Sequence, residues 1–334
     1  MKGGGSLPDS MVGQSSGQPP LPQFDVHLTP PDLRKWIEGN TGISGFTTRD
    51  SLRPGPHVAL IALTHGNEIA GAIALDRLLS GSLCPSRGRI TYGFVNLNAF
   101  ARFDPRQPTT SRFVDEDINR VWDPAVLDGP RHSSELDRAR EIRPLIETVD
   151  VLLDLHSMLW PSDPLLLSGA SDKGRRLALA IGVPDLVVAD HGHASGRRLI
   201  DYPRFAAADT EAAATLVEAG QHWERQAVDI TLACIAGLLR HLGLAKNEPG
   251  LPLAGPGGRQ PRFAEVTMVV TATTSNFRFV EAFRGGHVVP KRHTLIAHDG
   301  PAEIRTPHDE CLLVMPSLRP SRGHTAVRLA RFVN

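Results

Sequence analysis

The sequence has no excess of charge of either sign, few cysteines and no long apolar run. Lys+Arg and Asp+Glu each number 36, so the formal net charge is zero. A neutral chain has no overall electrostatic field that would draw it to nucleic acid or to an anionic membrane surface. We therefore expect no nucleic-acid partner, and a small molecule or a peptide is favoured as the ligand.

Cysteine usage and hydropathy bear on the compartment. Cys84, Cys234 and Cys311 are odd in number and far apart, which fits neither a disulfide framework nor a Cys-x-x-Cys metal site. No stretch approaches the roughly 18 apolar residues of a membrane span, and the N-terminus lacks a basic segment followed by an apolar one. These absences predict a cytoplasmic protein without a membrane partner. The oligomeric state stays open, a homo-oligomer included.

The chain is long enough for two unequal domains. It has 334 residues, 41% of them hydrophobic, which suffices for a sizeable core. Residues 1–22 are rich in Gly, Ser and Pro, and we expect a disordered leader there. Pro and Gly become dense again at 246–262, which predicts a linker between a first domain (23–245) and a C-terminal β domain (246–334).

Short apolar runs alternate with longer helical patterns in the first domain. This alternation predicts an α/β fold with a mostly parallel or mixed sheet flanked by helices. The expected strands are 57–63, 90–96, 149–155, 185–189 and 214–218, the expected helices are 68–79, 134–149 and 221–242, and β-rich runs follow at 266–272, 287–289 and 311–315.

Two histidines and a glutamate occupy the ends of the predicted strands. His65 and Glu68 directly follow one apolar run, where open α/β sheets keep their ligand sites, and His156 ends another. Parallel strand ends can lie side by side, so the three residues can supply a His2Glu set that leaves one zinc position open. Asp154 points the same way as His156 and either orients its imidazole or binds nearby backbone.

An unusually polar segment, residues 111–120, lies between these strands. Its arginines, Arg112 and Arg120, and its Asn119 are suited to clamping carboxylate groups, because guanidinium groups match carboxylates in pairs of hydrogen bonds. A solvated loop with surface ion pairs is the alternative reading of the same residues.

These motifs together resemble a known family. His-Gly-Asn-Glu (65–68), Asn-x-Asn-Ala-x-Ala-Arg (96–102), Arg-Phe-Val-Asp-Glu-Asp-Ile-Asn-Arg (112–120) and Asp-Leu-His-Ser (154–157) occur in the order of the aspartoacylase and succinylglutamate desuccinylase family. That family is similar in fold to the zinc carboxypeptidases. The resemblance extends from about residue 57 to residue 220.

The resemblance implies a role for each matching residue. His65, Glu68 and His156 become ligands of one zinc ion per chain, and Arg112 polarises the scissile carbonyl. Asn119 and Arg120 hold the substrate carboxylate. Glu218, in Glu-x-Gly (218–220), becomes the general base, and it is also the only carboxylate inside its apolar run.

Two features depart from the family pattern. The family places a tyrosine of the C-terminal domain over the substrate, but the two tyrosines here are Tyr92 and Tyr202, which argues against aspartate-type specificity. Arg197 and Arg198 are the nearest candidates for the arginine that binds a second substrate carboxylate. His191 and His193 form either a second metal site or, as we favour, an ordinary or substrate-lining loop.

The sequence therefore predicts a zinc-dependent catalytic domain at 23–245 that hydrolyses the amide of a small N-acyl amino acid. A carboxypeptidase acting on peptides is the first alternative, since the same zinc centre supports it. A metal-free binding protein on a decayed hydrolase scaffold is the second, and the retention of Glu218 beside all three ligand types argues against it.

Overall fold

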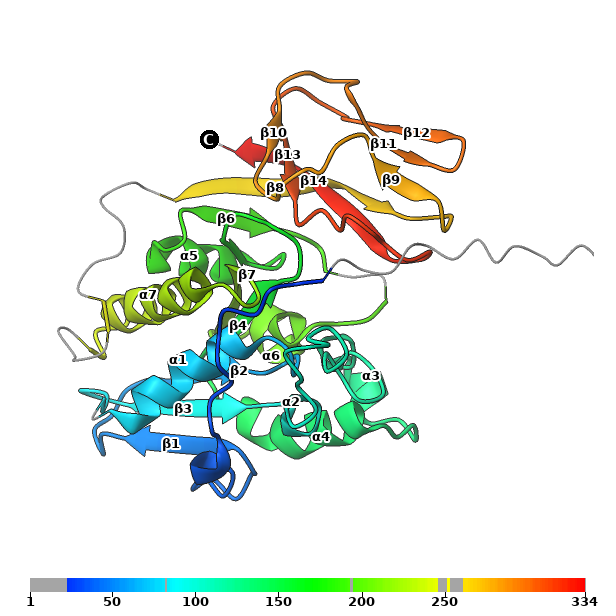
Figure 1. Cartoon of the computed structure of the whole chain (residues 1–334). Coiled ribbons are helices and arrows are strands. Elements are labelled where there is room, and N and C mark those ends of the chain that lie inside the picture. The colour runs from blue at the N-terminus through cyan, green and yellow to red at the C-terminus, as the bar shows by residue number, and fades with distance from the viewer. Residues whose placement is uncertain (1–22, 82, 193–194, 246–250, 253–260, 334) are drawn as a thin grey trace, which may run out of the picture.

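The computed structural model describes residues 23–81, 83–192, 195–245, 251–252 and 261–333. The predicted leader lies outside these ranges, as does most of the predicted linker. The described chain forms an α/β core with a smaller β region at its C-terminal end, which confirms the predicted fold class (Figure 1).

One mixed sheet of eleven strands runs through the described part of the chain. In spatial order its strands are β1 (Phe46–Asp50), β3 (Arg89–Phe94), β2 (His57–Ala62), β4 (Val151–Met158), β7 (Ala213–Gln221), β5 (Leu165–Leu167), β6 (Leu186–Ala189), β8 (Arg262–Thr271), β14 (Thr325–Val333), β13 (Cys311–Val314) and β10 (Val288–Val289).

The central strands run parallel. β2 pairs in parallel with β3 and β4, and β4 pairs in parallel with β7. The carboxyl ends of these strands therefore meet at one edge of the sheet, which is where ligands bind in open α/β folds. β5 pairs antiparallel with β7, while β6 pairs in parallel with both β5 and β8.

Side chains that alternate along the central strands pack against helices on both faces of the sheet. On β2, Val58 and Leu60 pack into one hydrophobic cluster with the helices α1 (Ile69–Ser80), α5 (Asp172–Ile181) and α7 (Arg225–His241). Ala59 and Ile61 pack on the opposite face with α4 (Ser134–Ile146). No helix within the described ranges is long and apolar enough to cross a membrane.

The remaining helical elements are short. They are α2 (Leu97–Phe100), α3 (Pro124–Leu127), α6 (Pro203–Ala206) and three 3-10 turns, η1 (Arg34–Trp36), η2 (Ile118–Arg120) and η3 (Leu199–Asp201). Several begin with a side-chain cap. Asn96, for example, accepts a hydrogen bond from the Ala99 amide at the start of α2.

The C-terminal region contributes to two sheets. β12 (Ala302–Arg305), β11 (Leu295–Asp299) and β9 (Phe277–Phe279) form a small antiparallel sheet. β8, β14, β13 and β10 instead extend the large sheet, because β8 pairs with β6. Backbone pairing thus crosses the predicted boundary at residue 245, and the division into two domains stays a prediction.

Most predicted elements are present, with shifted ends. β4 continues to Met158 and β7 to Gln221, so His156 and Glu218 lie within their strands rather than at the last residue. Our prediction overlooked the strands β1, β5, β9, β11, β12 and β14 and the helix α5. β1 is an edge strand with four polar or charged residues in its five, and β5 has only three residues, too few to show a period.

Candidate metal centre and active site

The loop between β2 and α1 brings His65 and Glu68 together. Gly66 has to be glycine, because a Cβ there would lie 2.5 Å from the backbone of Ala99 and Phe100. Glu68 occupies the N-cap position of α1 but makes no capping hydrogen bond. Its carboxylate is instead turned toward the two histidines.

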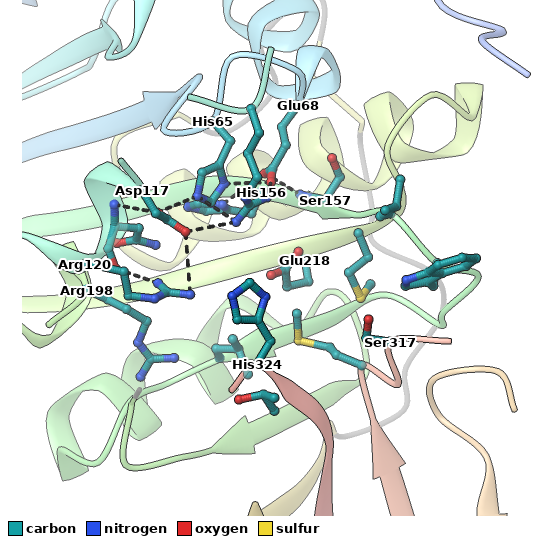
Figure 2. Close-up of a pocket in the computed structure, with 18 of the residues that line it drawn as sticks. His65, Glu68, Asp117, Arg120, His156, Ser157, Arg198, Glu218, Ser317 and His324 are labelled. Carbon is teal, nitrogen blue, oxygen red and sulfur yellow. Dashed lines mark hydrogen bonds and ion pairs between the residues drawn. The ribbon is translucent and has the colours of Figure 1, made fainter. Parts of the chain in front are cut away.

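Parallel pairing delivers the third residue of the cluster. β4 lies beside β2, with Asp154 opposite Ile61, and His156 lies opposite Glu218 of β7. His65 and His156 therefore meet with ring centroids 5.0 Å apart, although 91 positions separate them in the chain. The predicted juxtaposition of the two strand ends is present (Figure 2).

The three side chains offer convergent ligand atoms. Glu68 Oε1 lies 2.7 Å from His65 Nδ1, and Glu68 Oε2 lies 3.0 Å from His156 Nδ1. One ligand atom from each residue can be chosen so that all lie within 4.8 Å of one another, and all three residues are buried. Two imidazole nitrogens and a carboxylate oxygen are a donor set that zinc accepts, so the residues present fit this metal.

Neighbouring charges outweigh the effect of burial on the pKa values of Glu68 and His156. Burial raises the pKa of Glu68, but His65 and His156 outweigh it and hold the pKa well below its ordinary value. Burial lowers the pKa of His156, but Asp154 and Glu68 outweigh it and hold that pKa well above its ordinary value. The cluster therefore stabilises the ionised carboxylate that a cation needs.

Carboxylates contact the outer nitrogens of both imidazoles. Asp154 Oδ2 lies 2.9 Å from His156 Nε2, and Asp154 Oδ1 accepts a hydrogen bond of 2.8 Å from Thr64. The contact with His156 lacks hydrogen-bond geometry, and the orienting role of Asp154 stays a prediction. Asp117 Oδ1 lies 2.9 Å from His65 Nε2, a partner that our sequence reasoning missed.

Arg112 reaches the same cluster from the polar segment. Its Nη1 donates to Glu68 Oε1 at 3.2 Å, and its Nη2 lies 3.2 Å from Asp117 Oδ2. Glu135 holds the segment by accepting hydrogen bonds from three successive backbone amides, at 114–116. The side chain is 36% exposed and lines the cavity.

Glu218 stands opposite the cluster without a partner of its own. The side chain is 7% exposed, and its buried Oε2 has no hydrogen-bond partner within the described part of the chain. Burial, helped by the charge of Glu68, raises its pKa to about 8, against the opposing influence of His156 and Arg112. A buried carboxyl with a raised pKa and an unused oxygen is typical of a proton-transfer group.

These groups open into a cavity of about 750 Å³. Glu218, His65, His156 and Arg120 line it, and so do residues of the C-terminal region, including Met315, just after β13, and Arg328 of β14. The volume suits a small ligand rather than a macromolecule.

A model of the succinylglutamate desuccinylase/aspartoacylase catalytic domain family matches residues 54–242. The chain belongs to this family. A curated relative, the succinylglutamate desuccinylase of Ectopseudomonas mendocina (strain ymp), is 37% identical over 107 residues. That alignment spans 30% of this chain and 28% of the relative.

Solved structures of the family share the fold. A succinylglutamate desuccinylase/aspartoacylase from Rhodobacter sphaeroides superposes with a TM-score of 0.63 at 21% identity, over 86% of this chain and 89% of its own. Succinylglutamate desuccinylase from Vibrio cholerae superposes with a TM-score of 0.63 at 18% identity. The superposition covers 87% of this chain and 86% of the Vibrio chain. The family resemblance drawn from the sequence motifs is thereby confirmed.

Of the four candidate substrate-binding residues, Asn119, Arg120 and Arg198 line the main cavity and Arg197 does not. Asn119 and Arg120 line the cavity, and the amide oxygen of Asn119 accepts a hydrogen bond of 2.8 Å from the Leu199 amide. Burial lowers the pKa of Arg120 to about 10, with Asp117 opposing the fall and neighbouring guanidinium groups adding to it. This concentration of positive charge favours a bound anion at Arg120.

Arg197 and Arg198 differ from each other in position. Arg197 is absent from the cavity lining: it pairs with Asp123 at 3.5 Å and lines a second, smaller cavity. Arg198 lines the main cavity, but it is buried and bonded to Asp190 and Asp201, each at 2.7 Å. A β-bridge from residue 121 to 197 turns the first arginine away from the site.

The histidine loop after β6 gains no support as a metal site. His191 lines the second cavity, and His193 lies outside the described residues. Within the described ranges, His65, Glu68 and His156 are the group whose ligand atoms converge.

Three further cavity residues escaped sequence reasoning. His222 is buried, contacts Ser157 Oγ at 2.8 Å and follows the end of β7, which is the signal that identified the other two histidines. Arg328 stands inside the apolar run of β14 and is 4% exposed. Asp117 lay within the polar segment that we singled out.

Proposed function

We propose that this chain is a zinc-dependent hydrolase that cleaves the amide bond of a small N-acyl amino acid. His65, Glu68 and His156 would hold one zinc ion per chain. The observation that carries the proposal is the convergence of this buried ligand set with an unpartnered carboxyl, Glu218, in one cavity. The family and the name of its curated relative support the same reaction class.

The residues of the chain divide the work of amide hydrolysis. Bound zinc would supply Lewis acidity toward a water molecule and a carbonyl oxygen. Glu218 accepts the proton of the attacking water and passes it to the leaving nitrogen. The charge of Glu68 helps to raise the pKa of Glu218 to about 8, and a cation held by Glu68 would lower that pKa.

Two positively charged side chains bind the rest of the substrate. Arg112, which contacts Glu68 and faces the cavity, stabilises the negative charge that develops on the carbonyl oxygen. Arg120, with Asn119 beside it, binds the carboxylate of the amino acid. Arg198 supports this end of the cavity through its bonds to Asp190 and Asp201.

A carboxypeptidase acting on peptides is the nearest alternative. A long peptide needs an open groove, whereas the C-terminal region contributes Thr271, Met315 and Arg328 to the cavity wall. This wall favours a small substrate. A binding protein without catalysis has no use for a buried carboxyl such as Glu218.

A substrate screen tests the proposal. The zinc-loaded protein should release free amine from at least one member of a panel of N-acetyl, N-succinyl and N-formyl amino acids. Glu218→Gln should keep zinc and fold but lose at least about 100-fold in kcat, the low end for a positioned acid-base group. Glu211→Gln, an exposed acid near the start of β7, serves as the matched control. Loss of zinc from Glu218→Gln would make Glu218 a ligand instead.

A further inference from the structure

The arginines that line the cavity lie either at the ligand cluster, where Arg112 contacts Glu68, or toward one end of the cavity. Four guanidinium groups line it, and each contacts Asp117 or Asp190. Arg112 and Arg120 lie 3.2 and 3.7 Å from Asp117, and Arg198 and Arg328 lie 2.7 and 3.3 Å from Asp190. Among the described residues that line the cavity there is no further arginine and no lysine.

The opposite end is mainly apolar, with the polar groups of Ser157, Ser317 and His222 beside it. Met158, Leu159 and Trp160 line it directly after Ser157, and Met315 and Pro316 line it directly before Ser317. In Figure 2, Ser157 and Ser317 lie on the other side of His156 and Glu218 from Arg120 and Arg198. A molecule cleaved beside Glu218 therefore has arginines at one of its ends and methionine and tryptophan side chains at the other.

Aromatic packing holds the apolar end in place. The Trp160 ring lies 5.5 Å from Phe24, edge to face, and Phe24 packs in the same way on Trp223 at 5.6 Å. Trp223 in turn donates a hydrogen bond of 3.1 Å to the carbonyl of Asn67, in the loop between His65 and Glu68. The apolar wall is thus preformed and tied to the catalytic loop.

We propose that the acyl group of the substrate is an unbranched apolar chain of about four to eight carbons, bound against Met158, Trp160 and Met315. The inference rests on the proposed function and names its substrate class. An acyl group ending in a carboxylate, such as succinyl, would place its charge where the described lining offers hydroxyl and imidazole groups but no arginine or lysine, and would lose much of its hydration there. Each buried methylene instead strengthens binding about fourfold.

Binding to the zinc-loaded Glu218→Gln variant tests the inference without turnover. Calorimetry would compare N-acetyl, N-butyryl, N-hexanoyl and N-succinyl derivatives of alanine, leucine and glutamate. For the best-bound amino acid, we expect the hexanoyl derivative to bind at least about tenfold more tightly than the acetyl one, and the succinyl derivative to bind no better than acetyl. Tightest binding of the succinyl derivative, equal affinities, or no binding at all would overturn the inference.

Turnover by the wild-type protein separates the two proposals. Chain-length-dependent binding without hydrolysis of any derivative contradicts the proposed function alone. Hydrolysis that prefers N-succinyl derivatives contradicts the inference alone.

A pair of methionine variants locates the effect. Met315→Gln keeps an unbranched side chain but places an amide in the apolar wall, and we expect it to reduce the hexanoyl-over-acetyl preference in kcat/KM by at least about fivefold. Met268→Gln, an exposed methionine of β8 outside the cavity, should retain the wild-type preference. An unchanged preference in Met315→Gln would remove this wall from the acyl site.

Discussion

At the scale of single residues, the candidate centre depends on which side chains contact Glu68. Both of its oxygens are taken, one by His65 and the other by His156, and all three groups are buried. Without His156, Glu68 would still contact His65, Arg112 and the Ser157 amide, but a bound ion would keep only two of its three protein ligands.

His156→Ala should therefore lose zinc. Removing even an outer partner of a metal ligand costs 10- to 100-fold in affinity, so loss of the ligand itself should weaken zinc binding by more than about 100-fold. Metal analysis of the purified protein should give about one zinc per wild-type chain and almost none in the variant. His324→Ala, an exposed histidine that also lines the cavity, is the control and should retain zinc. Equal zinc content in His156→Ala would exclude that residue from the site.

Replacing Arg112 and replacing Arg120 should change different kinetic constants. Arg112 contacts Glu68, beside the reacting carbonyl, so Arg112→Ala should mainly lower kcat, by roughly 100-fold or more. Arg120 lies at the arginine end of the cavity, so Arg120→Ala should mainly raise KM. Steady-state kinetics of both variants on one substrate decide the matter, and matching kinetic changes would contradict this division of roles.

At the scale of elements, one buried aspartate ties the small C-terminal sheet to the large one. Asp299, at the end of β11, accepts hydrogen bonds from the amide and hydroxyl groups of both Thr273 and Thr274, which follow β8. Burial raises the pKa of Asp299, but these four hydrogen bonds outweigh it and lower the pKa to about 2.

The pH dependence of stability follows from that direction. Because the pKa is lower in the folded than in the unfolded protein, the ionised carboxylate stabilises the fold above about pH 4 and loses its effect as the pH falls toward 2. Asp299→Asn should cost about 1 to 3 kcal/mol of stability at pH 7 and less at low pH. Urea unfolding at several pH values measures this, with Asp229→Asn on the exposed face of α7 as control. A loss independent of pH would rule out the carboxylate's charge as the cause.

At the scale of the whole molecule, the predicted domain boundary meets a continuous sheet. β6 of the first region pairs in parallel with β8 of the second, and Arg328 from β14 lies 3.3 Å from Asp190, just after β6. Both regions thus share backbone hydrogen bonds and a buried ion pair.

We expect the full chain to unfold in one calorimetric transition. Unfolding of the C-terminal strands would expose the edge of β6 and one wall of the cavity. We therefore expect both regions to unfold at the same temperature. A fragment of residues 23–245 should accordingly melt at a lower temperature than the whole chain. Two resolved transitions, or an equally stable fragment, would show that the regions are independent domains.

The predictions of a cytoplasmic location, of a possible homo-oligomer and of no nucleic-acid partner remain predictions. They came from composition and net charge, which constrain solubility and partners rather than fold.

Local features of the sequence determined the α/β class and the candidate metal-binding set of His65, Glu68 and His156. Apolar runs that end in His65, His156 or Glu218 carry this information because a buried parallel strand has a recognisable composition and its polar end faces the ligand edge. The chain order of the family motifs added the candidate roles of Arg112, Arg120 and Glu218.

Only the tertiary structure decided which distant groups meet. The contacts of Asp117 with His65, the turning of Arg197 away from the cavity, and the approach of Met315 and Arg328 from beyond residue 300 all depend on strand pairing between remote segments. A strand shows its own period in the sequence but not its neighbour. Sheet order and register are set by packing and loop geometry over the whole chain, so the shape and polarity of the cavity could not be derived from local pattern.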